Sequence, residues 1–180
     1  MRWLATAALL FCVADATAIT IVVGNTPTRV SLRVGSPGGQ IDLVTFTVPA
    51  ANVGDGVPVA GTVPGQGGLA GFCPANTVYV EIEGRASPAN SRTVTLSVDS
   101  TQPLSNGIDT IPFTQIDWIS TGFPPVSIPS GTFSGGAGQV LVSFQNSRVA
   151  LQCLRFRYLN QSVVGAGTYN GRVVYGVTMP

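Results

Sequence analysis

Few residues in this chain have the types and the spacing that catalysis needs. Glu81 and Glu83 alternate on one face of a predicted strand, and two carboxylates placed in this way could share general acid and base work. The favoured interpretation of this pair is a solvated outer face of a sheet. The chain contains no His, and every basic residue is Arg. A Ser–His–Asp triad, a Cys–His dyad and a Lys Schiff base are therefore excluded.

Three other polar features also favour structural interpretations. Arg155 and Arg157 share one face of a predicted strand, where a solvated polar face is favoured. Asn160-Gln161-Ser162 fits the glycosylation acceptor pattern, which matters only in a eukaryotic secretory pathway. Residues 65–71 are rich in Gly but lack the Lys of a phosphate-binding loop. We predict a protein that is not an enzyme and that has no catalytic residue, cofactor or metal site.

The N-terminal stretch has the order of a secretory signal peptide. Arg2 supplies the positive charge, residues 3–13 are apolar, and Ala16-Thr17-Ala18 is a small-x-small cleavage site. The alternative is a short buried strand or helix. An apolar run of about 11 residues is shorter than the roughly 20 that a membrane span needs. We predict that residues 1–18 are removed on export and that no membrane span remains after cleavage.

Cleavage would leave two cysteines, Cys73 and Cys153. In an exported protein two cysteines most simply form one disulfide, although two buried free thiols are the alternative. The bridge would close a loop of about 80 residues and contribute roughly 4 kcal/mol in the chain-entropy account. Two cysteines without a His do not complete a zinc site.

Composition excludes partners that are attracted by strong charge. Charged residues make up 9% of the 180 residues, hydrophobic residues 44%, and the net charge is +1. No strong field would draw nucleic acid or an anionic membrane to such a chain. The hydrophobic content also argues against a disordered chain.

The elements that must position these residues are strands. Short alternating runs recur between stretches of Gly, Pro, Asn and Ser, and no helical period persists for three turns. About nine strands are predicted, which favours an all-β sandwich or barrel. The spacing slips between Phe113 and Ile116, so a bulge is plausible there. The predicted strands are residues 19–23, 29–34, 41–48, 77–83, 92–98, 110–120, 139–145, 151–159 and 166–180. Two long loops are expected at residues 49–72 and 120–138, and the second could hold a short edge strand.

The last run, "AGTYNGRVVYGVTMP", reads as a strand at the chain end. Its period-two pattern places one set of side chains on one face, with Gly171 in the same register: Tyr169, Val173, Tyr175, Val177 and Met179. Val174 is the exception on the opposite face. An edge strand is a template for pairing with another chain, so the pattern raises the question of which strand pairs with it.

These features together resemble the fimbrial (pilin) subunits that bacteria assemble by the chaperone–usher route. The closest likeness lies in the C-terminal run, where Gly167 stands fourteenth from the end and is followed by alternating apolar residues. The run "A-G-x-Y-x-G-x-V" is especially similar to CFA/I-like and spore-coat-U-like pilins. Elsewhere the likeness rests on length, signal peptide and all-β character.

The resemblance implies an immunoglobulin-like β-sandwich that lacks its last strand and is completed by a donor strand from a neighbouring subunit. Residues 19–27 would be the donor extension and residues 28–180 the single pilin domain. Ile19, Ile21 and Val23 are the favoured donor side chains, because Ile buries more apolar area than Thr; Thr20, Val22 and Gly24 are the opposite register. The alternative is that residues 19–23 form an ordinary first strand of their own sheet.

The implied partners are other copies of the chain in a homopolymer, a periplasmic chaperone and an outer-membrane usher. The implied location is the periplasm in transit and then a cell-surface fimbrium for adhesion or biofilm formation. A second hypothesis is a self-contained secreted β-sandwich, such as a coat or carbohydrate-binding module. Trp118, Phe123 and Tyr158 would then form a sugar-stacking site, although a core position is favoured for Trp118.

Overall fold

The computed structural model describes residues 28–35, 43–64, 72–87, 91–145 and 148–180. The predicted signal peptide and donor extension, residues 1–27, lie outside the described residues. The described part of the chain is all-β, with two short 3-10 turns as its only helical segments. The turns are η1 (Ala50–Asn52) and η2 (Phe113–Gln115). The strands are β1 (Arg29–Val34), β2 (Val59–Ala60), β3 (Val78–Arg85), β4 (Thr93–Asp99), β5 (Leu104–Ser105), β6 (Thr110–Ile111), β7 (Ile116–Phe123), β8 (Gly131–Thr132), β9 (Gln139–Gln145), β10 (Arg148–Tyr158) and β11 (Val174–Thr178).

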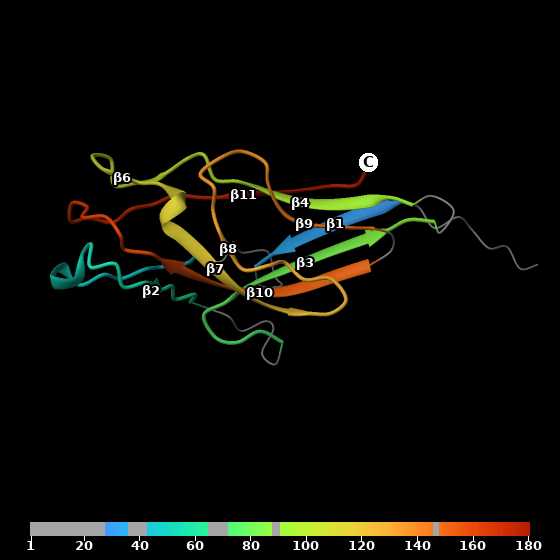
Figure 1. Cartoon of the computed structure of the whole chain (residues 1–180), viewed down its shortest axis with the longest axis horizontal. Coiled ribbons are helices and arrows are strands. Elements are labelled where there is room, and N and C mark those ends of the chain that lie inside the picture. The colour runs from blue at the N-terminus through green and yellow to red at the C-terminus, as the bar shows by residue number, and fades with distance from the viewer. Residues whose placement is uncertain (1–27, 36–42, 65–71, 88–90, 146–147) are drawn as a thin grey trace, which may run out of the picture.

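Two antiparallel sheets form the body of the molecule. The large sheet has the order β1-β3-β10-β7-β8, with β2 also paired to β10, and the small sheet has the order β11-β4-β9. A separate two-stranded pair, β5-β6, is bridged from Ser105 to Asn170. Asn170 belongs to the C-terminal segment, residues 163–180, which contains β11 (Figure 1). The all-β prediction is confirmed.

The core forms where the inner faces of both sheets meet. Alternation predicts which side chains face inward: Val94, Leu96 and Val98 of β4 are all essentially inaccessible to solvent, and so are Val80 and Ile82 of β3. Each such aliphatic side chain contributes roughly 1.5–3 kcal/mol when it is withdrawn from water. Residues from both sheets belong to one continuous cluster, so a single core serves the domain.

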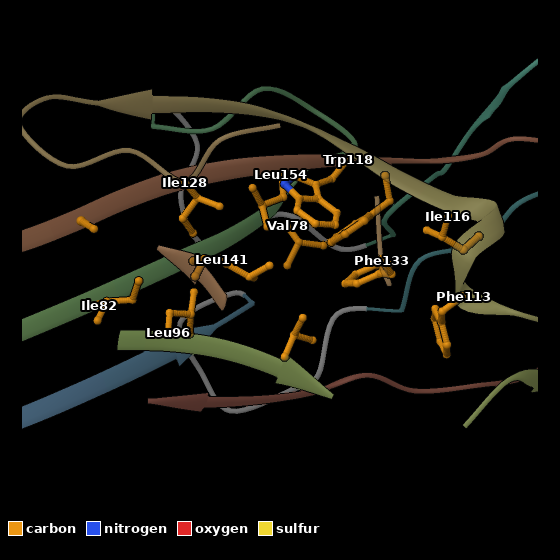
Figure 2. Packing of buried hydrophobic residues seen from close by; sticks show 14 of the residues in the cluster. Val78, Ile82, Leu96, Phe113, Ile116, Trp118, Ile128, Phe133, Leu141 and Leu154 are labelled. Atoms are coloured by element: carbon orange, nitrogen blue, oxygen red, sulfur yellow. The ribbon is translucent and has the colours of Figure 1, made fainter. Parts of the chain in front are cut away.

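An aromatic group fills one end of this core. The ring of Phe133 lies 4.9 Å from that of Trp118, 5.6 Å from that of Phe113 and 5.9 Å from that of Phe156, measured between centroids. Figure 2 shows Phe113 and Ile116 at one end of the core and Ile82 and Leu96 at the other. The indole nitrogen of Trp118 donates to the carbonyl of Pro129 at 2.8 Å, which satisfies the one polar atom of that side chain.

Two local predictions were wrong. The slip between Phe113 and Ile116 is not a bulge, because the chain makes the η2 turn there, which follows Pro112 and lets Phe113 enter the core. The predicted strand 41–48 is reduced, in its described part, to one bridge between Thr45 and Thr62. Thr62 lies two residues after β2, which pairs with β10. Ile41 and Asp42 lie outside the described residues.

Other predictions hold. A short edge strand, β8, does occur within residues 120–138 and pairs with the start of β7. The disulfide is formed between Cys73 and Cys153, whose Cα atoms are 5.6 Å apart. It ties the segment before β3 to the middle of β10 and therefore staples the large sheet to the long loop that precedes it.

Candidate functional site: the C-terminal segment and its edge

The C-terminal segment lies over the core with its apolar face inward. The five side chains that the alternating pattern groups together are all half-buried and pack against the core: Tyr169, Val173, Tyr175, Val177 and Met179. Val174, on the opposite face, is 55% exposed. Burial raises the pKa of the Tyr175 hydroxyl above its ordinary value.

Only the last part of this segment is a strand. Residues 174–178 pair with β4, so that Val177 lies opposite Leu96 and Tyr175 opposite Val98. Farther back, Asn170 and Ser105 exchange two backbone hydrogen bonds of 2.9 Å, which attach the segment to β5. The predicted strand 166–180 is therefore shorter than its alternation suggests, because β4 ends at Asp99.

Two glycines of this segment, Gly167 and Gly171, lie where a side chain would collide with the chain around β5. Gly167 has φ +157°, and a Cβ at that position would come within 2.9 Å of the amide nitrogen of Asn106. A Cβ at Gly171 would come within 3.0 Å of the Cα of Leu104. Both glycines allow the segment to cross close above the β5-β6 pair.

β11 is an edge strand, since β4 is its one strand partner in the described part of the chain. The neighbouring edge of the large sheet is β1, and Cα atoms of β1 and β11 come within 8 Å of one another. This is closer than the usual spacing of about 10 Å between facing sheets. The half-buried side chains of the two edges form what we call the apolar seam: Val30, Leu32, Val34, Tyr175, Val177 and Met179.

A cavity of about 770 Å³ opens at the other end of the C-terminal segment. One wall is residues 43–48 with the start of η1, the opposite wall is residues 163–170, and Ile111, Ile116 and Tyr158 lie between them. Tyr158 is 5% exposed, and its hydroxyl has no hydrogen-bond partner among the described residues. No local sequence pattern predicts this cavity, because its walls come from segments more than 100 residues apart.

The candidate acid pair lies in an array of ion pairs. Glu81 is 3.3 Å from Arg33, Glu83 is 3.7 Å from Arg29, and Arg85 bonds to Glu83 as well. The hydroxyl of Tyr79 donates to Glu81 at 3.1 Å. Burial, with Glu81 as a lesser cause, raises the pKa of Tyr79 to about 12. Each carboxylate thus has a structural partner on the outer face of the large sheet.

The remaining candidates separate in space. Arg157 forms a two-pronged ion pair with Asp117, whereas Arg155 is exposed. Trp118 and Tyr158 are buried and Phe123 is exposed, so the three residues of the hypothetical sugar site do not share one surface.

Asn160 is a structural residue rather than a glycan acceptor. It is fully buried, its Oδ1 accepts from the Gly54 amide, and its Nδ2 donates to the Asn52 carbonyl and to Asp55. Its φ of 53° places it in the left-handed region, which Asn tolerates better than most residues. The fold thus uses Asn160 to fasten the loop after η1.

No cluster of three or more His, Cys, Asp or Glu side chains could hold a metal ion within the described ranges. No helix of the described chain has the length and apolar character of a membrane span.

No protein-family model, no curated protein and no solved structure matches this chain, so its function must be argued from its own geometry.

Proposed function

We propose that the protein is a structural fimbrial subunit, an immunoglobulin-like domain that polymerises by donor-strand exchange. The observation that carries the proposal is the position of β11: it is an edge strand with an apolar inner face, and its outer edge has no strand partner among the described residues. An open edge of this kind accepts an added strand through backbone hydrogen bonds, while pockets for alternate side chains give specificity.

The strand order supports an incomplete immunoglobulin-like sandwich. A complete domain has strands A, B, E and D in one sheet and C, F and G in the other. The order β1-β3-β10-β7 follows A-B-E-D in both sequence and space, and β4 and β11 correspond to C and F. A seventh strand, G, would lie beside F, where β11 has its open edge. β9 is an extra strand on the outer side of β4.

The donor would be the segment Ile19–Thr26 of a neighbouring copy. The five residues "ITIVV" equal β11 in length, and Ile19, Ile21 and Val23 would then fill the apolar seam. Such head-to-tail contacts between different surfaces do not close on themselves and therefore build a filament. A periplasmic chaperone would protect the same edge before an outer-membrane usher releases the subunit to the cell surface. The filament would serve adhesion or biofilm formation.

A second candidate function is a self-contained secreted coat or binding module. The close approach of β1 and β11 favours it, because the two edges already meet along part of their length. A donor strand that pairs with β11 would require β1 to move away from it. The two candidates therefore differ in whether the seam opens.

The test compares two forms of the mature chain. The first is Ile19–Pro180, and the second carries "ITIVVGNT" at its C-terminus through a short linker instead of at its N-terminus. We expect the first to polymerise or aggregate and the second to be a monomer with a cooperative unfolding transition, measured by light scattering after size exclusion and by urea unfolding. A first form that is already a stable, cooperative monomer would refute the proposal.

Matched substitutions in the relocated strand give the register. In the favoured register Ile21→Asp places a charge in the core and destroys the added stability, whereas Val22→Asp points outward and is tolerated. The reverse result would assign the register of Thr20, Val22 and Gly24. If neither substitution changes the unfolding midpoint, the strand does not complete the domain.

A further inference from the structure

The cavity beside residues 163–170 is distinct from the edge used in the proposed polymer. A donor of five residues opposite Val174–Thr178 spans about 17 Å of strand. The cavity walls lie before that strand in the chain, at residues 163–170, and across from residues 43–48. The cavity therefore lies outside the part of β11 that the five residues "ITIVV" would cover.

The size and lining of the cavity suit a small molecule. A volume of about 770 Å³ lies within the range of roughly 300–1,000 Å³ that is usual for ligand sites. The described lining residues include no charged side chain, and most are apolar. Leu43 and Val163 line the cavity yet are 65% and 82% exposed, so apolar side chains also frame its mouth. The Asp109 carboxylate lies beside the wall residues Gly165 and Tyr169, so an anionic ligand would lose its hydration here without gaining a counter-charge.

Tyr158 carries the buried side-chain polar atom of the lining that has no hydrogen-bond partner among the described residues, whereas Thr45, Thr47, Thr168 and Asn170 are exposed. Asn160 uses both amide atoms in the bonds to the loop after η1, and the hydroxyl of Tyr169 donates to the Gly165 carbonyl at 2.9 Å. Tyr158 has no such partner among the described residues. A buried polar group without a partner costs about 1–3 kcal/mol, which a ligand atom would recover.

The hydroxyl of Tyr158 keeps its proton at neutral pH. Burial raises its pKa above the ordinary value, and the nearby Tyr169 is a smaller cause. Tyr158 can therefore donate a hydrogen bond, and a complementary ligand would offer an acceptor such as a ketone, ester or ether oxygen.

We propose that this cavity binds a small, neutral, mostly apolar molecule whose hydrogen-bond acceptor takes the hydroxyl of Tyr158. The walls would hold the apolar body of the ligand between residues 43–48 and 163–170, and Tyr158 would fix its orientation. This assignment goes beyond the proposed structural role and does not depend on polymerisation.

The test uses the mature chain and the neutral naphthalene ketone Prodan, whose emission moves to longer wavelength when its carbonyl accepts a hydrogen bond. We expect saturable binding to the unmodified protein. Tyr158→Phe should weaken binding by a factor of roughly 3 to 10 and shift the bound emission to shorter wavelength, because the carbonyl loses its donor. Tyr79→Phe, on the outer face of the large sheet, is the matched control and should change neither quantity.

Two further measurements locate the site and define the ligand class. Val164→Trp fills the cavity from its wall and should abolish binding, with urea unfolding used to show that the variant is folded. Methyl decanoate should displace Prodan at least tenfold more effectively than decanoate, because the carboxylate is charged. The proposal is overturned if Prodan does not bind saturably, if Tyr158→Phe behaves like Tyr79→Phe, or if decanoate competes as well as its ester. None of these variants should alter the oligomeric state, so the outcome is separate from that of the polymerisation test.

Discussion

Two edge strands, β1 of the large sheet and β11 of the small sheet, differ in how they are protected against pairing with another strand. β1 has the sequence "RVSLRV", and its outward residues Arg29 and Arg33 pair with glutamates of β3. β11 has the sequence "VYGVT", with no charge and no proline. Natural proteins blunt exposed edges with charges, prolines or bulges, and β11 has none of these devices.

The same contrast extends across the outer faces of the sheets. The large sheet carries most of the charged residues of the described chain on its outward face: Arg29, Arg33, Glu81, Glu83, Arg85, Asp117, Arg155 and Arg157. The small sheet presents hydroxyls instead, with Thr95 bonded to Ser143 at 3.0 Å across the β4-β9 ladder. The large sheet therefore has a charged outer face, whereas the β11 edge of the small sheet carries no charge.

The largest expected effect concerns a covalent tie that only the large sheet has. Replacing Cys73 and Cys153 together by Ser should lower the free energy of unfolding by about 2–5 kcal/mol, because the unfolded chain loses its cross-link. Urea unfolding of the double variant measures the loss, and the unmodified protein under reducing conditions is the control. A loss below about 1 kcal/mol would show that the large sheet does not depend on the bridge.

The next effect compares the β11 edge with its paired neighbour. Leu96→Ala should cost about 2–5 kcal/mol, because Leu96 is fully buried. Val177, which lies opposite Leu96, is only half-buried, so Val177→Ala should cost about 1 kcal/mol in the isolated domain. Linking "ITIVVGNT" to the C-terminus should raise the cost of Val177→Ala, and the same linkage should leave the cost of Leu96→Ala unchanged. Equal costs for Val177→Ala in both forms would contradict a donor strand at this edge.

The third effect is a loss of stability at alkaline pH. The pKa of Tyr79 is raised to about 12 in the folded protein, so its contribution to stability is complete below the unfolded value near 10 and is lost as the pH rises from 10 to 12. At pH 11 about 1 kcal/mol of this contribution has been lost. Tyr79→Phe should flatten the fall in unfolding free energy between pH 10 and 11, measured by urea titration. Tyr175→Phe tests the β11 side of the comparison in the same way, since burial also raises the pKa of Tyr175.

The smallest effect concerns the charges that protect β1. Arg33→Ser removes the ion pair with Glu81 and should cost about 0.2–1 kcal/mol, because both side chains are partly exposed. This loss of stability should shrink in 1 M salt, where exposed charges are screened.

The opposite change, Thr178→Arg, adds a charge to the β11 edge. It should reduce self-association without lowering stability by more than about 0.5 kcal/mol. Unchanged self-association would show that the β11 edge is not the joint.

Several features could be predicted from sequence because they depend on local alternation. The inward residues of β1, β4 and β11 follow a period of two, since successive side chains of a strand point to opposite faces. The disulfide could be predicted by counting cysteines, because removal of the predicted signal peptide leaves only Cys73 and Cys153. Other features could not be predicted, because they depend on what lies opposite. The run 41–48 alternates well, yet its described part forms only the bridge between Thr45 and Thr62, because alternation does not determine whether a partner strand lies alongside.

The sequence by itself determined the all-β class and the face that each long strand buries, because both depend on residue types and short-range period. It favoured one disulfide between Cys73 and Cys153, which the structure confirms. Tertiary structure alone decided that β11 is an edge beside β1 and that Asn160 is buried at the loop after η1. It also decided that Tyr158 lines a cavity and that its hydroxyl has no hydrogen-bond partner among the described residues. Each of these depends on segments distant in the chain coming together, and the energy of such contacts is not contained in any local pattern. For the same reason, the pattern of "AGTYNGRVVYGVTMP" indicates which side chains face inward, and only the fold shows which edge of that segment is open.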